Sequence, residues 1–238
     1  MVTKFLSIQS TYKILEIALF HDQRVVEHVV TSAVKASSGL VQVIQNLLKK
    51  HGILLENLDF IAINHGPGAF ISIRVGISLV NGIYAALGTP LVDINGLEGL
   101  VQEGKSFVKG SDNFPWIVAL LNAYGNEVYF LISHVHGDIL AHKHMGCTKI
   151  DECMALVKKC AKDDCAVFVG NGSFLHYDLI KVHKNYRILE HCSGEVSAKT
   201  VGFMAYQKWQ YNERVCFSTV ISPLYLKTQL FAVNKELR

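Results

Sequence analysis

Several features that mark common protein classes are missing from this 238-residue chain. Its longest apolar runs, such as residues 53–55 and 118–121, are far shorter than the roughly 20 residues that cross a bilayer. The N-terminal segment has Lys4 before two apolar residues and then turns polar, which is not the pattern of a secretory signal. We therefore expect a cytoplasmic protein with no membrane segment.

Strong charge of one sign is also missing. Lysine and arginine number 23 against 20 aspartates and glutamates, which leaves a net charge of +3 with histidine neutral. Small basic clusters occur at Lys49–Lys50, at Lys158–Lys159, and at Lys181, Lys184 and Arg187. We interpret them as solvated helix ends, with contact to a nucleic acid as the alternative, because a phosphate-binding surface needs a larger positive field.

Cysteine is absent from the first 146 residues, and no pair has the spacing Cys-x-x-Cys. Disulfide frameworks stabilise small domains with thin cores, whereas half of this chain is hydrophobic. We therefore predict reduced thiols, and nothing favours a disulfide between Cys160 and Cys165. The six cysteines are Cys147, Cys153, Cys160, Cys165, Cys192 and Cys216.

What is present is a regular alternation of strand and helix patterns. Apolar residues with period two, or in short buried runs, predict strands, and those at spacings of three and four predict helices. The first half is predicted to have strands at 5–8, 14–20, 24–31, 58–63 and 91–94, with helices at 40–48, 71–87 and 97–103. The second half is predicted to have strands at 115–121, 127–133, 139–145, 166–169 and 187–189, with helices at 150–160 and 172–182. A last helix is predicted at 197–210.

Both halves have the order strand-strand-strand-helix-strand-helix, which indicates an α/β protein. This order resembles the ribonuclease-H-like unit that occurs twice in the actin-like ATPase (ASKHA) superfamily. We predict two lobes, each with a mixed sheet flanked by helices. The first lobe is expected to span 1–104 and the smaller one 105–196, with 197–238 packing back on the first.

In such ATPases the turn after the first strand of each lobe carries a carboxylate, because Mg²⁺ prefers hard anionic oxygen ligands. The corresponding residues here are Gln9, Ser10 and Thr11 in the first lobe and Asn122 in the second. An uncharged amide is a poor substitute, which argues against phosphoryl transfer and against a two-metal nuclease. We predict a degenerate nucleotide site in which Gln9 and Asn122 cap turns.

The segment 66–76 combines a strand end, a rigid Gly-Pro-Gly turn and a helix start. Such a turn can direct backbone N–H groups at an anion, or it can simply connect a strand to a helix. Spacing alone leaves both interpretations open. The residues that define the segment are Gly66, Pro67, Gly68, Phe70, Arg74 and Gly76.

The same segment resembles the signature Gly-Pro-Gly-Ser-Phe-Thr-Gly-Leu-Arg-x-Gly of the TsaB (YeaZ) family. Further segments are similar in order: residues 5–19, 87–92, 97–100, 127–129 and 223–227. The chain departs from the family pattern at Gln9, where Asp is usual, and at 122–124, where Asn-Ala-Tyr replaces Asp-Ala-Arg. Ala69, Ile71 and Ser72 also differ from the signature.

The resemblance implies a noncatalytic partner subunit of the bacterial complex that makes threonylcarbamoyladenosine in tRNA. The expected partners are a TsaD-like catalytic subunit and a TsaE-like ATPase, with tRNA reached through the complex. The catalytic subunit of this superfamily binds a metal through His-x-x-x-His, and the aligned residues here are Gly96 and Leu100. We therefore expect no catalytic residue, metal or cofactor in this chain alone, and ATP or ADP and a metal in the wider complex.

The resemblance also implies that the two helices at 40–48 and 71–87 form the partner interface, in a homodimer or with the catalytic subunit. Core packing is the alternative for Leu40, Ile44 and Leu47, while Val41 and Leu48 are predicted to face the partner. The predicted interface residues are Leu40, Val41, Val43, Ile44, Leu47, Leu48, Ile73, Arg74, Ile77, Ser78 and Asn81.

Two alternatives to this function remain: an acyl or sugar kinase of the same superfamily, and a divergent homodimeric binding protein. A histidine-based metal site is a further hypothesis. His134 and His136, and His142 and His144, are spaced to share a face of a strand, but no third ligand lies at a convincing spacing. We interpret these histidines as solvent-exposed.

Overall fold

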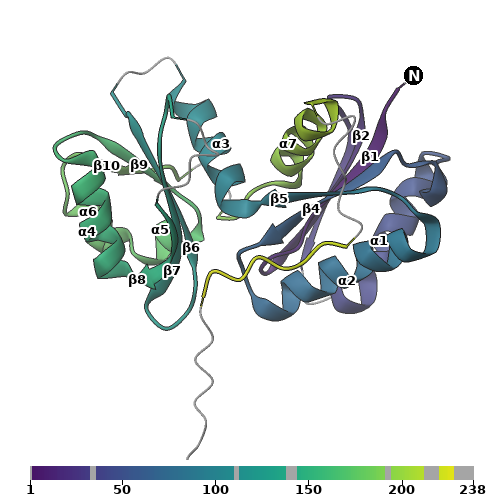
Figure 1. Cartoon of the computed structure of the whole chain (residues 1–238), viewed down its shortest axis with the longest axis horizontal. Helices are drawn as coiled ribbons and strands as arrows, with labels where there is room; N and C mark the ends of the chain where they lie inside the picture. Colours follow the sequence, from purple (N-terminus) through teal and green to yellow (C-terminus); the bar gives the residue numbers. More distant parts are fainter. Residues whose placement is uncertain are drawn as a thin grey trace, which may run out of the picture.

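The computed structural model describes residues 2–32, 36–109, 113–137, 144–190, 194–211 and 220–227, without the side chains of 32 and 36–38. They form two α/β lobes side by side, each built on a five-stranded sheet (Figure 1). The two sheets have the same strand order.

The sheet of the first lobe has the order β3-β2-β1-β4-β5. β1, β2 and β3 pair antiparallel, whereas β4 and β5 join as parallel strands. Because side chains alternate between the two faces of a strand, Phe5 packs on one face of β1 while Leu6 and Ile8 pack on the other. The helices α1 and α2 cover the Leu6 face, and α7 covers the Phe5 face. The bounds are β1 Lys4–Gln9, β2 Ile14–His21, β3 Arg24–Ser32, β4 Phe60–Gly66, β5 Leu91–Asn95, α1 Ala36–Lys50, η2 Leu55–Asn57, α2 Phe70–Leu87 and α7 Ala198–Tyr211.

The sheet of the second lobe, written from its opposite edge, has the order β8-β7-β6-β9-β10 and so repeats the first. β6, β7 and β8 pair antiparallel, and β9 and β10 are parallel to β6. α4 and α6 pack on one face of this sheet, and α3 packs on the other. The bounds are α3 Gly96–Val108, β6 Trp116–Asn122, β7 Glu127–His134, β8 Met145–Lys149, α4 Ile150–Ala161, β9 Ala166–Val169, α5 Asn171–Leu175, α6 Tyr177–Lys181 and β10 Tyr186–Ile188.

The space between the two sheets holds α3 and α7 (Figure 1). One continuous apolar cluster runs from Phe5, Phe20 and Phe60 of the first lobe to Ile117 and Val169 of the second. The lobes therefore share a core there, and the turns at the carboxyl ends of both sheets are held close to one another.

The predicted two-lobed α/β architecture is confirmed, with one local correction. Most of the strand predicted at 139–145 lies outside the described residues, and the strand that the structure shows in this region is β8, which begins at Met145. Pairing of β8 with β7, from Met145 opposite Leu131 to Lys149 opposite Glu127, sets its bounds more than local apolar content does. The helix predicted at 172–182 is divided into α5 and α6 at His176, whose φ is −112°.

The prediction of free thiols holds for the cysteines that the structure describes. Cys147, Cys153, Cys160 and Cys165 are all free, so the Cys160–Cys165 disulfide is not formed. Burial raises the pKa of the Cys153 thiol to about 12, which makes it an inert core residue. Cys192 and Cys216 lie outside the described residues.

Candidate functional site

The Gly-Pro-Gly segment packs directly on the turn between β1 and β2. The backbone N–H of Ala69 donates to the carbonyl of Thr11 at 2.7 Å. A Cβ atom on Gly68 would lie 2.5 Å from that same carbonyl oxygen, and one on Gly76 would lie 2.4 Å from Ser10 Oγ. Gly68 is therefore required by the close approach of the Thr11 backbone, and Gly76 leaves room for the Ser10 side chain. The segment joins β4 to α2 and holds the turn that follows β1.

Gln9 lies at the end of β1, 1% exposed, and all of its amide atoms have partners. Its Oε1 accepts a hydrogen bond from Asn64 Nδ2 at 2.6 Å, and its Nε2 donates to Thr11 Oγ1 at 2.9 Å and to Glu195 Oε2 at 3.1 Å. Asn64 Oδ1 in turn accepts from the N–H of Gly66 at 2.9 Å. These residues, Gln9, Thr11, Asn64 and Glu195, form what we call the amide network.

The amide network does not fit a metal ion. The oxygen of Gln9 is already occupied by a donor, and its N–H groups point at the oxygens that a cation would need. Gly96 has no side-chain atom that could coordinate a metal. A Cβ there would lie 2.7 Å from Asn64 Nδ2, so a larger side chain has no room. Leu100 is completely buried in the core. Within the described ranges, no group of three His, Cys, Asp or Glu residues could hold a metal.

Asn122 ends β6 in the second lobe, opposite the β1–β2 turn. Its Oδ1 accepts from the N–H of Tyr124 at 2.8 Å, so it caps the β6–β7 turn. Its N–H donates to Asn171 Oδ1 at 2.8 Å, and its carbonyl accepts from the Tyr12 hydroxyl at 2.8 Å. The last bond joins the turns of the two lobes. Burial of Tyr12 raises the pKa of its hydroxyl well above the usual range, so it stays a donor.

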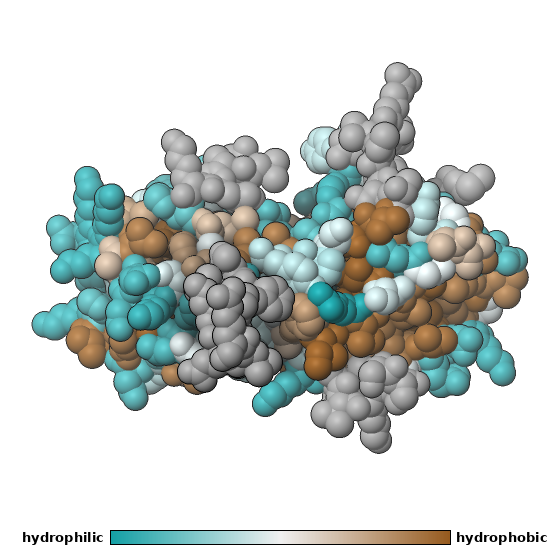
Figure 2. Space-filling view, turned by 60° about the horizontal axis from the view of Figure 1, so that its bottom comes forward, coloured by the Kyte–Doolittle hydropathy of each residue, from teal (hydrophilic) through white to brown (hydrophobic). Residues whose placement is uncertain are grey.

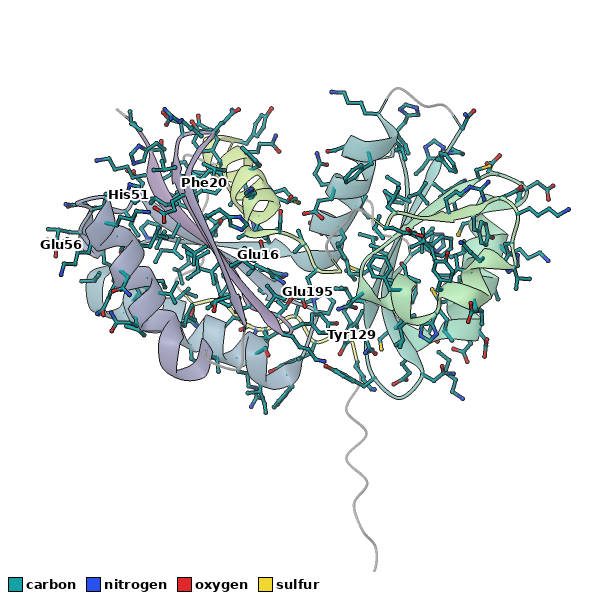
Figure 3. The ribbon with its side chains drawn as sticks, turned by 180° about the vertical axis from the view of Figure 1, so that it is seen from behind. Glu16, Phe20, His51, Glu56, Tyr129 and Glu195 are labelled. Carbon is teal, nitrogen blue, oxygen red and sulfur yellow. The ribbon has the colours of Figure 1, made fainter. Side chains whose placement is uncertain are left out.

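Three carboxylates surround the start of α7: Glu16, which is buried, and Glu103 and Glu195, which are half-buried. Glu16 and Glu195 are labelled in Figure 3. Glu16 Oε2 accepts from the N–H of Ala198 and from His28 Nε2, both at 3.0 Å. Glu103 Oε1 accepts from the N–H of Ser197 at 2.9 Å, and burial raises its pKa. Carboxylates at a helix N-terminus are favoured by the helix dipole.

The third carboxylate, Glu195, has a strongly raised pKa. Burial raises its pKa to about 7, and the repulsion from Glu16 adds to this effect. Hydrogen bonds from Gln9 Nε2 and from the backbone N–H of Lys13 oppose the shift. Sequence reasoning missed both Glu195 and Asn64, because neither belongs to a motif and each reaches the site only through the fold.

A cavity of about 570 Å³ opens between the Gly-Pro-Gly segment, the β6–β7 turn and residues 220–227. Its wall is largely aromatic, and two lysines line it. These residues are Tyr12, Phe70, Tyr124, Tyr129 and Tyr225, together with Lys13 and Lys227.

The predicted interface residues divide between core and surface. Leu48 was expected to face a partner, but it is 4% exposed and packs in the core of the first lobe, on the buried face of α1 with Leu40, Ile44 and Leu47. Val41 is half exposed, and Arg74 and Ser78 are exposed, whereas Val43 and Asn81 are half-buried. The remaining members, Leu40, Ile44, Leu47, Ile73 and Ile77, are buried in the core.

Much of the outer face of α2 is nevertheless apolar, apart from Arg74 and Ser78. Ile71 is 74% exposed and Leu87 is 45% exposed, with the small residues Gly82, Ala85 and Ala86 between them. Figure 2 shows apolar side chains gathered on this side of the first lobe. Of the described helices, α2 alone is long and apolar enough to cross a bilayer. One such helix is weak evidence, because core helices of soluble proteins pass the same test.

Of the two histidine pairs, only His134 and His136 lie wholly among the described residues, and they do not share a strand. His134 ends β7, but His136 lies in the turn that follows, with ring centroids 5.8 Å apart. His144 precedes β8, and His142 lies outside the described residues.

Two facing lobes of the same ribonuclease-H-like topology define the actin-like ATPase fold, here with amides at both turns. The family model of "TsaD: tRNA N6-adenosine threonylcarbamoyltransferase" matches residues 30–229. The chain therefore belongs to this family, and it is a TsaB-type (YeaZ-type) protein.

The named relatives include both threonylcarbamoyltransferases and TsaB proteins. The chain is 27% identical over 130 residues to the tRNA N6-adenosine threonylcarbamoyltransferase of Phocaeicola vulgatus, a match that covers 52% of this chain and 36% of that one. It is 29% identical over 91 residues to the tRNA threonylcarbamoyladenosine biosynthesis protein TsaB of Haemophilus influenzae, covering 38% and 37%. The chain thus spans about a third of the length of these relatives. The structure of YeaZ from Pseudomonas aeruginosa has the same fold, with a TM-score of 0.70 at 21% identity, covering 94% of this chain and 100% of that chain.

Proposed function

We propose that this chain is a noncatalytic subunit of the complex that makes N6-threonylcarbamoyladenosine in tRNA, and that it acts in the cytoplasm by binding and stabilising a TsaD-like catalytic subunit. The amide network is the observation that carries the proposal. Where an ATPase of this fold needs a carboxylate, this chain has a set of hydrogen bonds among Gln9, Thr11, Asn64 and Glu195. The metal ligands of a catalytic relative align with Gly96 and Leu100, whose side chains cannot coordinate a metal. The catalytic subunit would supply the metal, and a TsaE-like ATPase would complete the complex.

The docking surface in this proposal is the outer face of α1 and α2. Val41 on α1 and Ile71 and Leu87 on α2 are exposed apolar residues, and the small side chains at Gly82 and Ala85 would let a partner helix approach closely. A second copy of the chain could use the same face, which gives a homodimer when the catalytic subunit is absent.

Light scattering on a sizing column tests the proposal, with the chain alone and mixed with the TsaD-like subunit of its own organism. We expect a new peak at the summed mass. Val41→Glu should weaken it, because a charge would be buried in an apolar interface. Val182→Glu is the matched control: Val182 is 80% exposed and lies just after α6, in the second lobe.

Three results would count against this proposal. Two unmixed peaks would contradict direct binding of the catalytic subunit. An equal effect of both variants would contradict the assignment of the surface, as would unfolding of Val41→Glu. Thermal stabilisation of the isolated chain by Mg²⁺–ATP would instead support a kinase of the same fold.

A further inference from the structure

Residues 220–227, which we call the strap, run in an extended path from α2 of the first lobe to the second lobe (Figure 1). The start of the strap is anchored through both backbone polar groups of Ile221. Asn81 Nδ2 donates to the carbonyl of Ile221, and Asn81 Oδ1 accepts the N–H of Ile221, both at 2.9 Å. Ile221 itself is 3% exposed and belongs to the core of the first lobe.

The middle of the strap is tied to the Gly-Pro-Gly segment. The N–H of Leu224 donates to the carbonyl of His65 at 2.9 Å, and Leu224 packs against Gly66. The Tyr225 hydroxyl accepts a hydrogen bond from Arg74 Nε at 2.9 Å. The same Arg74 lies 3.7 Å above the ring of Phe70, which is stacked near Tyr225 at 5.7 Å between centroids. Arg74 and Asn81, expected at the partner face, are therefore contacts of the strap.

The end of the strap crosses to the second lobe through one side chain. Lys227 Nζ lies 2.5 Å from Glu127 Oε2 and 3.1 Å from the carbonyl of Ala123, and it also reaches the carbonyl of Tyr124 at 3.5 Å. Two of these acceptors belong to the β6–β7 turn, and Glu127 is the first residue of β7. The side chains of Lys227 and Glu127 are 39% and 31% exposed, and water competes for an ion pair of that kind.

The two ends of the strap thus differ in kind. The Ile221 end is held by a buried side chain and by two part-buried hydrogen bonds to the Asn81 side chain, and the Lys227 end by a partly solvated cation. Leu224, Tyr225 and Lys227 also line the cavity between the lobes, together with Tyr12 and Tyr124. Detachment of Lys227 would remove one wall of that cavity and one of the bonds between the lobes.

We propose that the strap is a latch: its Lys227 end releases and rebinds the β6–β7 turn, which opens and closes the cavity between the lobes, while its Ile221 end stays fixed. The proposal stands on these contacts and does not depend on which partner binds α1 and α2.

Hydrogen exchange on the full chain tests the latch through Lys227→Glu, which places two carboxylates together. The amides of 225–227 and of the β6–β7 turn should exchange several-fold faster, while the amides of Ile221 and Leu224 keep their rates. Adding Glu127→Lys should restore slow exchange by reversing the pair. Lys159→Glu, on an exposed residue at the end of α4, is the matched control and should change neither segment.

Unchanged exchange in both segments would overturn the latch, because Lys227 would then hold nothing. Equal acceleration over the whole of 220–227 would also overturn it, because the strap would detach as one unit without a fixed end. Melting temperatures measured on the same samples separate both outcomes from unfolding, and the rescued double variant keeps the test valid if Lys227→Glu alone folds poorly.

Discussion

Glu195→Gln should stabilise the protein above neutral pH. The pKa of Glu195 is about 7 in the folded chain, whereas its ordinary value is 4.5, and the largest cause is burial. A carboxylic acid with a raised pKa binds its proton more tightly in the folded state. Its contribution to stability is therefore favourable at low pH and is lost as the pH rises from about 4.5 to about 7.

The size of the effect follows from the shift. A difference of about 2.5 pKa units corresponds to roughly 3 kcal/mol at full ionisation. The glutamine amide carries no charge, and its oxygen can still accept the hydrogen bond from Gln9 or from the Lys13 N–H. The free energy of unfolding of the variant should thus exceed that of the parent by up to roughly 3 kcal/mol at pH 8. This corresponds to a rise in melting temperature on the order of 6–12 °C for a chain of this length. The two proteins should converge below pH 5.

Differential scanning calorimetry across pH 4.5 to 8.5 measures this difference directly, and subtraction of the parent curve cancels all other titrating groups. Glu56→Gln is the control, because Glu56 is exposed on η2 (Figure 3) and should give a flat difference. A Glu195→Gln difference that is independent of pH, or that has the opposite slope, would refute the assignment of a buried, destabilising carboxylate.

Three further substitutions test the packing of the site. Gly68→Ala should lower the free energy of unfolding by on the order of 1–3 kcal/mol, because its Cβ would lie 2.5 Å from the carbonyl of Thr11. Guanidinium unfolding measures the loss. Gly82→Ala is the control and should not destabilise the protein, because nothing lies within 4 Å of a Cβ there. Tyr12→Phe removes the hydroxyl bond to Asn122 and should cost about 1 kcal/mol; an unchanged midpoint would show that this bond does not hold the lobes together. Phe5→Ala removes a ring stacked between those of Phe20 and Phe60 and should cost roughly 3–5 kcal/mol by the same assay.

The repeated order of elements was predictable, because the burial pattern of each element follows from residues that are close together in the sequence. Strands such as β4 and β9 are short apolar runs, and α1 carries its buried residues at helical spacing, so one pass along the chain finds both halves. The bounds of β8 were not predictable, since they depend on which residues of β7 lie opposite.

Only part of the site was predictable, because some of its residues come from distant parts of the chain. Gln9 and Asn122 could be located because each follows the first strand of its lobe. Asn64 and Glu195, which complete the network around Gln9, come from 55 and 186 residues away along the chain. Leu48 shows the same limit on α1: the helical period gives the apolar arc, but only the sheet beneath decides which part of that arc is covered.

Restoring the carboxylate at Gln9 should therefore not restore a metal site. In Gln9→Asp the shorter side chain loses the N–H groups that now satisfy Thr11 Oγ1 and Glu195 Oε2, and it places a second carboxylate near Glu195. Two neighbouring carboxylates in a partly buried site should lower stability by roughly 3 kcal/mol at pH 8, and by much less at pH 5.5, where they can share protons. The isosteric Gln9→Glu should behave in the same direction. If MgCl₂ instead raises the melting temperature of Gln9→Asp at pH 8 and not that of the parent, the surrounding residues do accept a metal, and the site lacks only its carboxylate.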